Sequence, residues 1–212
     1  MRILLFIIVF ICTITIWKYD LLYYPVKEIN IETSDKRFNE NNIYNYLDNL
    51  YDKNLLKLDI NDIKAYITQD RWINDAVISK IFPGTLNIRI IEHKPMANYN
   101  SDVLTAIGEL IPDSSLENLP NIRDYTNNHI QSHKIYSEIS EKLSIIGLSI
   151  QKIEIYHSLV KIYTQKTILI SDNENLYMNI ERLLISFNKL KEVYKKEISS
   201  IDMRYSNGFA IK

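Results

Sequence analysis

The chain has 212 residues, of which 46% are hydrophobic, which suffices for one or two small domains beside a membrane segment. Its 25 Lys and Arg nearly balance its 26 Asp and Glu, which excludes the global basic field that nucleic-acid binders need. The single cysteine, Cys12, can form no intrachain disulfide, so the sequence leaves the redox compartment open.

The first apolar run, Ile3–Trp17, is preceded by Arg2 and followed by Lys18. Extended through Tyr23-Tyr24, which would form an interfacial aromatic belt, it predicts an uncleaved membrane anchor at residues 3–24. The alternative is a cleaved signal peptide, but no small-x-small cleavage site follows the apolar core. Because Arg2 lies before the run, residues 1–2 are expected in the cytoplasm and the rest outside.

Two apolar runs, Ala76–Phe82 and Leu86–Ile91, flank Pro83-Gly84-Thr85, and this pattern predicts a β-hairpin. The second run alternates apolar and polar residues, as in a strand with one buried face. Trp72 is expected to anchor the hairpin to the preceding helix. Pro95 is expected to end the strand pairing, because proline has no N–H to donate.

A strand and two helices are predicted before this hairpin. Val26–Glu32 has the pattern of a strand, Asn39 is placed to cap a helix at Glu40–Tyr51, and Asp59 is placed to cap another at Ile60–Gln69. The order strand, helix, helix, hairpin predicts a small α+β module at residues 25–97, with both helices on one face of the sheet.

This order, behind an N-terminal anchor, resembles the POTRA domain of the FtsQ/DivIB family of bacterial cell-division proteins. The residues that carry the resemblance are Trp72-Ile73, Phe82-Pro83 with Leu86, and Glu92, Pro95 and Ala97. Arg71 and Gly84 depart from the family pattern, at a cap and a turn position.

Residues 98–212 predict a mostly antiparallel β domain with two helices, so the fold class is α+β. The predicted strands are Val103–Ile107, Leu110-Ile111, Ile150–Tyr156, Leu159–Tyr163 and Thr167–Ser171. One helix, with Ile135, Ile139 and Leu143 in line, is expected to end at Gly147, and the other to start after Asp172-Asn173.

The C-terminal stretch Ile198–Lys212 is the most specific match to the family. Ser206-Asn207-Gly208 supplies turn residues for a tight hairpin, and Ile201 and Met203 alternate with Asp202 and Arg204. The stretch resembles the closing hairpin of the family's β domain. Because the chain ends within this last strand, one strand edge is expected to stay unpaired.

The sequence contains no pattern that indicates catalysis. His129-x-x-x-His133 has the spacing of two metal ligands on a helix, but no third ligand accompanies it, and two solvated histidines are the preferred interpretation. No nucleophile motif or phosphate-binding glycine loop is present. We therefore expect no enzymatic activity, no cofactor and no metal. The alternative, an exported enzyme or another POTRA-containing transport or assembly protein, has no supporting motif.

The resemblance implies a non-enzymatic scaffold of the divisome. Such a protein crosses the inner membrane once, exposes its domains to the periplasm and is enriched at the septum. Its β domain would bind FtsB, which is itself paired with FtsL, and FtsW, FtsI and FtsK are further partner types. No nucleic acid and no small-molecule substrate is implied.

Carried over by position, the resemblance places partner contacts on two segments of the chain. On the closing hairpin they fall on Arg204, Tyr205, Gly208 and Phe209, and on the second POTRA strand on Ile78 and Lys80. The competing interpretation is structural, because a surface charge, a packed aromatic, a turn glycine and a core side chain would also explain the hairpin residues.

Overall fold

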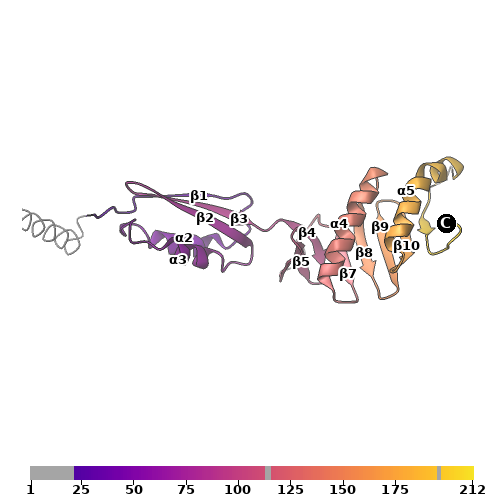
Figure 1. The fold of residues 1–212 in the computed structure, drawn as a ribbon, viewed down its shortest axis with the longest axis horizontal. Coiled ribbons are helices and arrows are strands. Elements are labelled where there is room, and N and C mark those ends of the chain that lie inside the picture. The colour runs from indigo at the N-terminus through magenta and orange to yellow at the C-terminus, as the bar shows by residue number, and fades with distance from the viewer. Residues whose placement is uncertain (1–21, 113–115, 195–196) are drawn as a thin grey trace, which may run out of the picture. The chain divides into compact units, whose positions relative to one another are not determined.

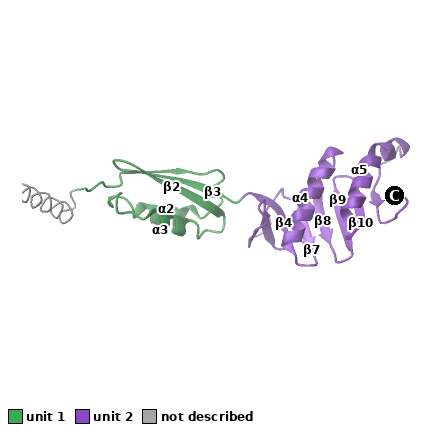
Figure 2. Ribbon diagram, in the orientation of Figure 1, with its two compact units in different colours: residues 1–93 green, residues 94–212 purple. Residues whose placement is uncertain are grey.

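The structure is a computed structural model that describes residues 22–112, 116–194 and 197–212. The chain divides after His93 into two compact units (Figure 2). The predicted anchor at residues 3–24 lies outside the described residues, except for Leu22 to Tyr24. None of the helices in the described ranges has the length and apolar character that a membrane crossing requires.

Unit 1 is a three-stranded sheet with two helices on one face (Figure 1). Its elements are β1 (Glu28–Glu32), α2 (Glu40–Asp48), α3 (Ile60–Ile67), β2 (Ile73–Ile81) and β3 (Thr85–Glu92). The strand order is β1-β3-β2, with β1 parallel and β2 antiparallel to the central β3. This confirms the element order that the sequence predicts.

The predicted helix caps in unit 1 are present. The side chain of Asn39 accepts a hydrogen bond from the Asn42 backbone N–H at 3.3 Å, and that of Asp59 accepts one from Asn61 at 2.8 Å. Both helices end a few residues earlier than predicted, at Asp48 and Ile67. Caps are local interactions between a side chain and the first turn, so a single sequence reveals them more readily than helix ends.

The apolar alternation of β3 places its leucine and isoleucines in the core. Leu86, Ile88 and Ile90 are all buried, whereas Val77 and Ile81 of β2 are about half exposed. Trp72 is only partly buried, while its neighbour Ile73 is fully enclosed. The tryptophan therefore packs against the core of unit 1 from its margin.

Unit 2 is a nine-stranded sheet with two helices packed on one face (Figure 1). Its elements are β4 (Pro95–Tyr99), β5 (Asp102–Thr105), β6 (Leu110–Ile111), β7 (Asn121–Asp124), α4 (His129–Ile145), β8 (Ile150–Ile155), β9 (Leu159–Thr164), β10 (Ile168–Asp172), α5 (Leu176–Val193), β11 (Ser200–Asp202) and β12 (Ala210–Ile211). The strand order is β12-β11-β10-β9-β8-β7-β4-β5-β6. Gly147, with φ of 74°, follows the end of α4 as predicted.

Strand β4 belongs to the second unit, although the sequence places the end of the first module at Ala97. Pro95 is the first residue of β4, a position that proline tolerates, and the strand pairs with β5 and β7. The boundary thus falls where backbone pairing changes from one sheet to the other.

A buried carboxylate, Asp124, joins β7 to the start of α4. It accepts hydrogen bonds from the Tyr99 hydroxyl at 2.8 Å, from the Ser132 hydroxyl at 2.9 Å and from the backbone N–H of Asn128 at 2.8 Å. Burial raises the pKa of Asp124, but these bonds and those from Thr126 outweigh it and lower the pKa below its usual value. The ionised carboxylate therefore fixes the position of α4 against the sheet.

Candidate functional site

The closing hairpin forms one edge of the nine-stranded sheet. Strand β11 pairs in parallel with β10 and antiparallel with β12, which has no further neighbour in the strand order. Ile201 and Met203 point into the core and are fully buried, so β11 is fixed by packing as well as by its backbone. The short β12 depends on β11 for its pairing within unit 2.

Among the described residues, the backbone of β12 pairs with β11 on one side and with no strand on the other. The N–H of Lys212 donates to the Ser200 carbonyl at 3.0 Å, and its carbonyl accepts from the Ser200 N–H at 3.2 Å. In an antiparallel pair, residues bonded in this way alternate with residues whose N–H and C=O point away from the neighbour. Ile211 therefore directs its N–H and C=O toward the free edge of the sheet.

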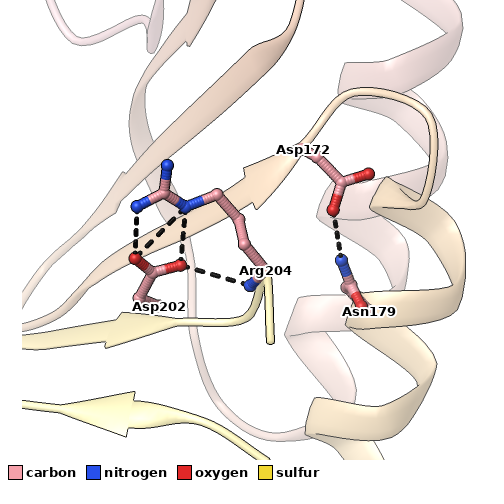
Figure 3. Close-up of polar contacts among 4 residues, drawn as sticks. All are labelled: Asp172, Asn179, Asp202 and Arg204. Carbon is pink, nitrogen blue, oxygen red and sulfur yellow. Dashed lines mark hydrogen bonds and ion pairs between the residues drawn. The ribbon is translucent and has the colours of Figure 1, made fainter. Parts of the chain in front are cut away.

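Arg204 is held by a carboxylate of its own hairpin (Figure 3). Its Nε lies 2.9 Å from Asp202 Oδ1, and its Nη2 lies 2.6 Å from Asp202 Oδ2. The Arg204 guanidinium lowers the pKa of Asp202, which keeps the carboxylate ionised. Within the described part of the chain, the third guanidinium nitrogen of Arg204, Nη1, makes no hydrogen bond, and the side chain is 49% exposed.

Arg182 of α5 fastens the turn of the hairpin to the helix. Its Nη2 donates to the carbonyls of Tyr205 at 3.0 Å and Gly208 at 3.3 Å. Its guanidinium carbon lies 5.2 Å from the centroid of the Phe209 ring, a cation–π contact. The helix therefore holds both sides of the turn through one side chain.

Arg182 is itself positioned by a buried amide. The side-chain oxygen of Asn179 accepts from Arg182 Nη1 at 3.0 Å, and its Nδ2 donates to Asp172 Oδ2 at 3.2 Å (Figure 3). Asp172 also accepts from the backbone N–H of Asn175 at 2.8 Å, the last residue before α5. Asp172, which the sequence places at the cap of α5, thus lies three residues before the N-cap, Asn175. There its carboxylate supports the start of the helix and orients Asn179.

A shallow hollow of about 350 Å³ lies between α5 and the turn. Its lining consists of Arg182, Ile185, Ser186 and the turn residues Ser206, Asn207, Gly208 and Phe209. Ile185 is 85% exposed, which is unusual for a large apolar residue of a helix that packs on a sheet. Apolar and cationic groups therefore lie beside the turn that leads into β12.

The predicted hairpin contacts lie at different depths. Arg204 and Tyr205 are exposed, with Tyr205 at 57%, whereas Gly208 and Phe209 are half-buried. Phe209 packs against the core of unit 2 and under Arg182, so it already has a structural function. Arg182 was missed in the sequence because only the fold brings α5 to the turn.

Comparison with known proteins identifies the first unit. A family model described as the POTRA domain of the FtsQ type matches residues 24–93. Residues 24–93 are an FtsQ-type POTRA domain. The match ends at the residue where the structure divides the chain, so the POTRA domain is unit 1.

Similarity to FtsQ extends over most of the chain. The cell division protein FtsQ of Cellvibrio japonicus is 22% identical over 92% of this chain, which spans 64% of that protein's length. FtsQ of Neisseria meningitidis is 24% identical, and the match covers 93% of this chain and 86% of that protein. FtsQ of Actinobacillus pleuropneumoniae is 26% identical, and the match covers 72% of this chain and 70% of that protein. These matches confirm the resemblance to the FtsQ/DivIB family and support a cell division protein with a POTRA domain.

The two predicted contacts in the POTRA domain face its helices. Ile78 lies opposite Ile88 and Lys80 opposite Leu86, and both partners are buried, so all four share the covered face. Ile78 is half-buried, and Lys80 Nζ donates to the carbonyls of Leu58 at 2.6 Å and Leu56 at 3.3 Å. Both side chains therefore have structural contacts, although β2 itself is an edge strand.

The histidine pair of α4 serves local contacts. His133 Nε2 lies 3.0 Å from the Ala106 carbonyl, and the His129 ring lies 6.4 Å from that of Tyr99. The described ranges contain no group of three or more His, Cys, Asp or Glu residues arranged to hold a metal ion.

Proposed function

We propose that the chain is a non-enzymatic scaffold of the bacterial divisome. In this proposal it is anchored in the inner membrane by residues 3–24, exposes its POTRA and β domains to the periplasm and is enriched at the septum. Its β domain binds an FtsB-type partner paired with FtsL. The similarity to FtsQ over most of the chain supports the assignment to cell division.

The observation that carries the partner-binding proposal is the free edge of β12. An unpaired strand edge recruits an extended segment of another protein by backbone hydrogen bonds, and side chains next to the edge select the segment. Ile211 offers one N–H and one C=O there. The hollow beside Ile185 lies at the turn that precedes β12 and offers apolar area to a segment that continues past the turn.

Arg204 contributes charge selection in this arrangement. Two of its nitrogens remain on Asp202, while Nη1 is available to an acidic side chain of the partner. Since Asp202 already neutralises part of the guanidinium charge, the gain from such a contact is smaller than for an unpaired arginine. Tyr205, exposed beside it, adds contact area.

The test is the substitution Ile211→Pro, measured for partner affinity and for stability of the chain. Proline removes the outward N–H and places its ring on the free edge, while the hydrogen bonds between Lys212 and Ser200 stay intact. Partner affinity should fall at least about tenfold, because a backbone hydrogen bond is lost and the approaching strand meets the ring. The thermal stability of Ile211→Pro should be similar to that of the control Ile211→Thr, which changes the side chain but keeps the backbone N–H.

Two further variants separate partner binding from closure of the domain. Lys212→Pro removes an N–H that bonds to Ser200, so it should weaken the hairpin itself. Arg204→Glu should lower affinity for an acidic partner by repulsion. If Ile211→Pro binds as tightly as Ile211→Thr, the free edge of β12 is not the binding site and the hairpin only closes the domain.

The POTRA contacts remain a weaker part of the proposal. Ile78 and Lys80 would act through the edge strand that carries them, since their side chains are engaged on the helix side. If Lys80→Ala reduces recruitment of FtsK-type partners, we therefore expect the POTRA domain of the same variant to be less stable. Reduced recruitment at unchanged stability would show direct contact.

A further inference from the structure

Large apolar side chains gather at the end of the POTRA domain where the described chain begins. Six of the exposed apolar residues in this domain belong to three neighbouring segments, and we call them the N-terminal patch: Leu22, Tyr23, Tyr51, Leu56, Ile81 and Phe82. Their exposed fractions lie between 42% and 53%. The other exposed large apolar residues of the POTRA domain lie elsewhere: Val77 and Ile91 are further along the sheet, and Ile60 begins α3.

Hydrogen bonds and ring contacts hold the three segments together. The side chain of Asn54 donates to the Leu22 carbonyl at 2.9 Å, and the Tyr23 hydroxyl donates to the Asp52 carbonyl. The Tyr24 and Phe82 rings pack edge to face with centroids 5.4 Å apart. These contacts hold the three segments next to one another, so the patch is part of the folded domain.

The glycine of the β2–β3 turn shows how closely these segments fit. A Cβ on Gly84 would lie 2.7 Å from the Pro25 carbonyl oxygen, and the Gly84 carbonyl accepts from the Lys27 N–H at 2.8 Å. The β2–β3 turn therefore packs against the backbone of Pro25 and Lys27, shortly after Leu22. Phe82 is placed beside the start of the domain as a result.

Chain continuity identifies the surface that this patch meets. Only Lys18 to Leu21 separate the apolar run Ile3–Trp17 from Leu22. If that run lies in a bilayer, as the proposed function has it, Leu22 starts within a few residues of the headgroups. Tyrosine is enriched in the zone between headgroups and acyl chains, and phenylalanine and leucine are typical of protein surfaces that enter this zone.

We propose that the N-terminal patch rests on the outer leaflet of the membrane that holds the anchor, with Leu56 and Phe82 in the region of the upper acyl chains. This inference rests on the proposed membrane topology. The POTRA domain then stands on the bilayer in one orientation, with a defined side of β2 accessible to other proteins.

The charges around the patch suit a lipid surface. In the sequence, Lys27, Lys53, Lys57 and Lys80 lie within or close to the patch segments, together with Glu28, Asp52 and Asp59. Lys80 Nζ is hydrogen-bonded to the carbonyls of Leu58 and Leu56. Asp59 is engaged as the cap of α3. Lysine side chains such as those of Lys27 and Lys53 can lay their apolar stems on the patch and reach headgroup phosphates with the ammonium group.

The test measures how deep single positions lie in a bilayer, using the full chain in vesicles of phosphatidylethanolamine and phosphatidylglycerol with brominated acyl chains. In a Cys12→Ser background, cysteine is introduced at Leu56, Phe82 or Val77 and labelled with an environment-sensitive fluorophore. Val77 is the matched control, since it is 52% exposed against 51% for Phe82 and lies in the same hairpin. Bromine should quench the label several-fold more at 56 and 82 than at 77.

A second variant tests whether the patch causes this orientation. Adding Leu56→Ser and Ile81→Ser to the labelled Phe82→Cys chain should reduce quenching at 82 to the level found at 77. Both residues are exposed, so the thermal stability of the POTRA domain should change little.

The outcomes separate this inference from the topology on which it rests. Equal quenching at all three positions, or none, in chains that stay on the vesicles after a carbonate wash would overturn the docking of the patch and leave the anchor in place. Chains removed by the wash would overturn the anchored topology and this inference with it.

Discussion

Glu92, one of the residues that carries the family resemblance, is a buried carboxylate that organises the loop after β1. Its Oε1 accepts from the Thr33 hydroxyl and from the backbone N–H groups of Asp35 at 3.0 Å and Lys36 at 3.1 Å. Its Oε2 accepts from the Arg37 N–H at 2.8 Å. The sequence placed Glu92 at a strand exit without indicating this function, because the donors lie more than 50 residues away along the chain.

The protonation of Glu92 is linked to the stability of the POTRA domain. Burial raises the pKa of Glu92, but the hydrogen bonds from Thr33 and the loop amides lower it from 4.5 to about 2. Since the folded pKa lies below the unfolded one, the carboxylate's contribution is complete above about pH 4.5 and is lost as the pH falls toward 2.

We therefore predict that Glu92→Gln destabilises the POTRA domain by about 3 kcal/mol at pH 7, because each unit by which folding lowers the pKa corresponds to about 1.4 kcal/mol. Near pH 2 the two proteins should be similar in stability. The measurement is urea unfolding at pH 7, 4 and 2, followed by Trp72 fluorescence in a Trp17→Phe background. Glu28→Gln, at an exposed position, is the control, and a Glu92→Gln penalty that does not change with pH would contradict the linkage.

At the scale of elements, local signals predicted the structure well and long-range pairing poorly. The hairpin of β2 and β3, the caps at Asn39 and Asp59 and the end of α4 at Gly147 each depend on neighbouring residues. The parallel pairing of β10 with β11 spans α5, and a sequence pattern of period two does not indicate which strands become neighbours.

The same distinction applies to the candidate site. The turn Ser206-Asn207-Gly208 and the buried positions of Ile201 and Met203 follow from the sequence. Asp202 ends β11 and Arg204 follows two residues later, so this spacing could be read from the sequence, but the bidentate contact between them could not. Strands β4 and β7 have five and four residues, which is too few to show a clear alternation of apolar and polar residues.

Arg182 gives a prediction at this scale. Arg182→Ala removes the hydrogen bonds to Asn179, Tyr205 and Gly208 and the contact with the Phe209 ring, which should cost the hairpin about 2 kcal/mol. Amide hydrogen exchange should accelerate in β11 and β12 while β8 and β9 stay protected.

Arg182→Lys is the matched variant, because lysine keeps the charge but has no planar fork to reach both carbonyls. Its exchange rates should lie between those of the original chain and Arg182→Ala. If amide exchange accelerates evenly over the whole sheet, Arg182 supports unit 2 as a whole, and the prediction that it acts on the closing hairpin is wrong.

At the scale of the molecule, the chain has two separate cores. One comprises buried residues from Val26 to Ile90 and the other buried residues from Ala97 to Met203, with no residue in common. Each unit has its own sheet and its own helices. Units with separate cores are expected to unfold in separate cooperative steps.

We therefore predict two calorimetric transitions, each sensitive to one core. Leu86→Ala should lower the midpoint of the POTRA transition and Ile162→Ala that of the β domain, each by the equivalent of about 2–5 kcal/mol, because both side chains are fully enclosed. In the double variant the two shifts should simply coexist, since sites without shared contacts act additively. At a temperature where only the POTRA domain of Leu86→Ala has melted, the binding of an FtsB-type partner that we propose for the closing hairpin should persist. A single transition that both substitutions lower, with partner binding lost in step, would mean that the two units fold as one and that the hairpin depends on the POTRA core.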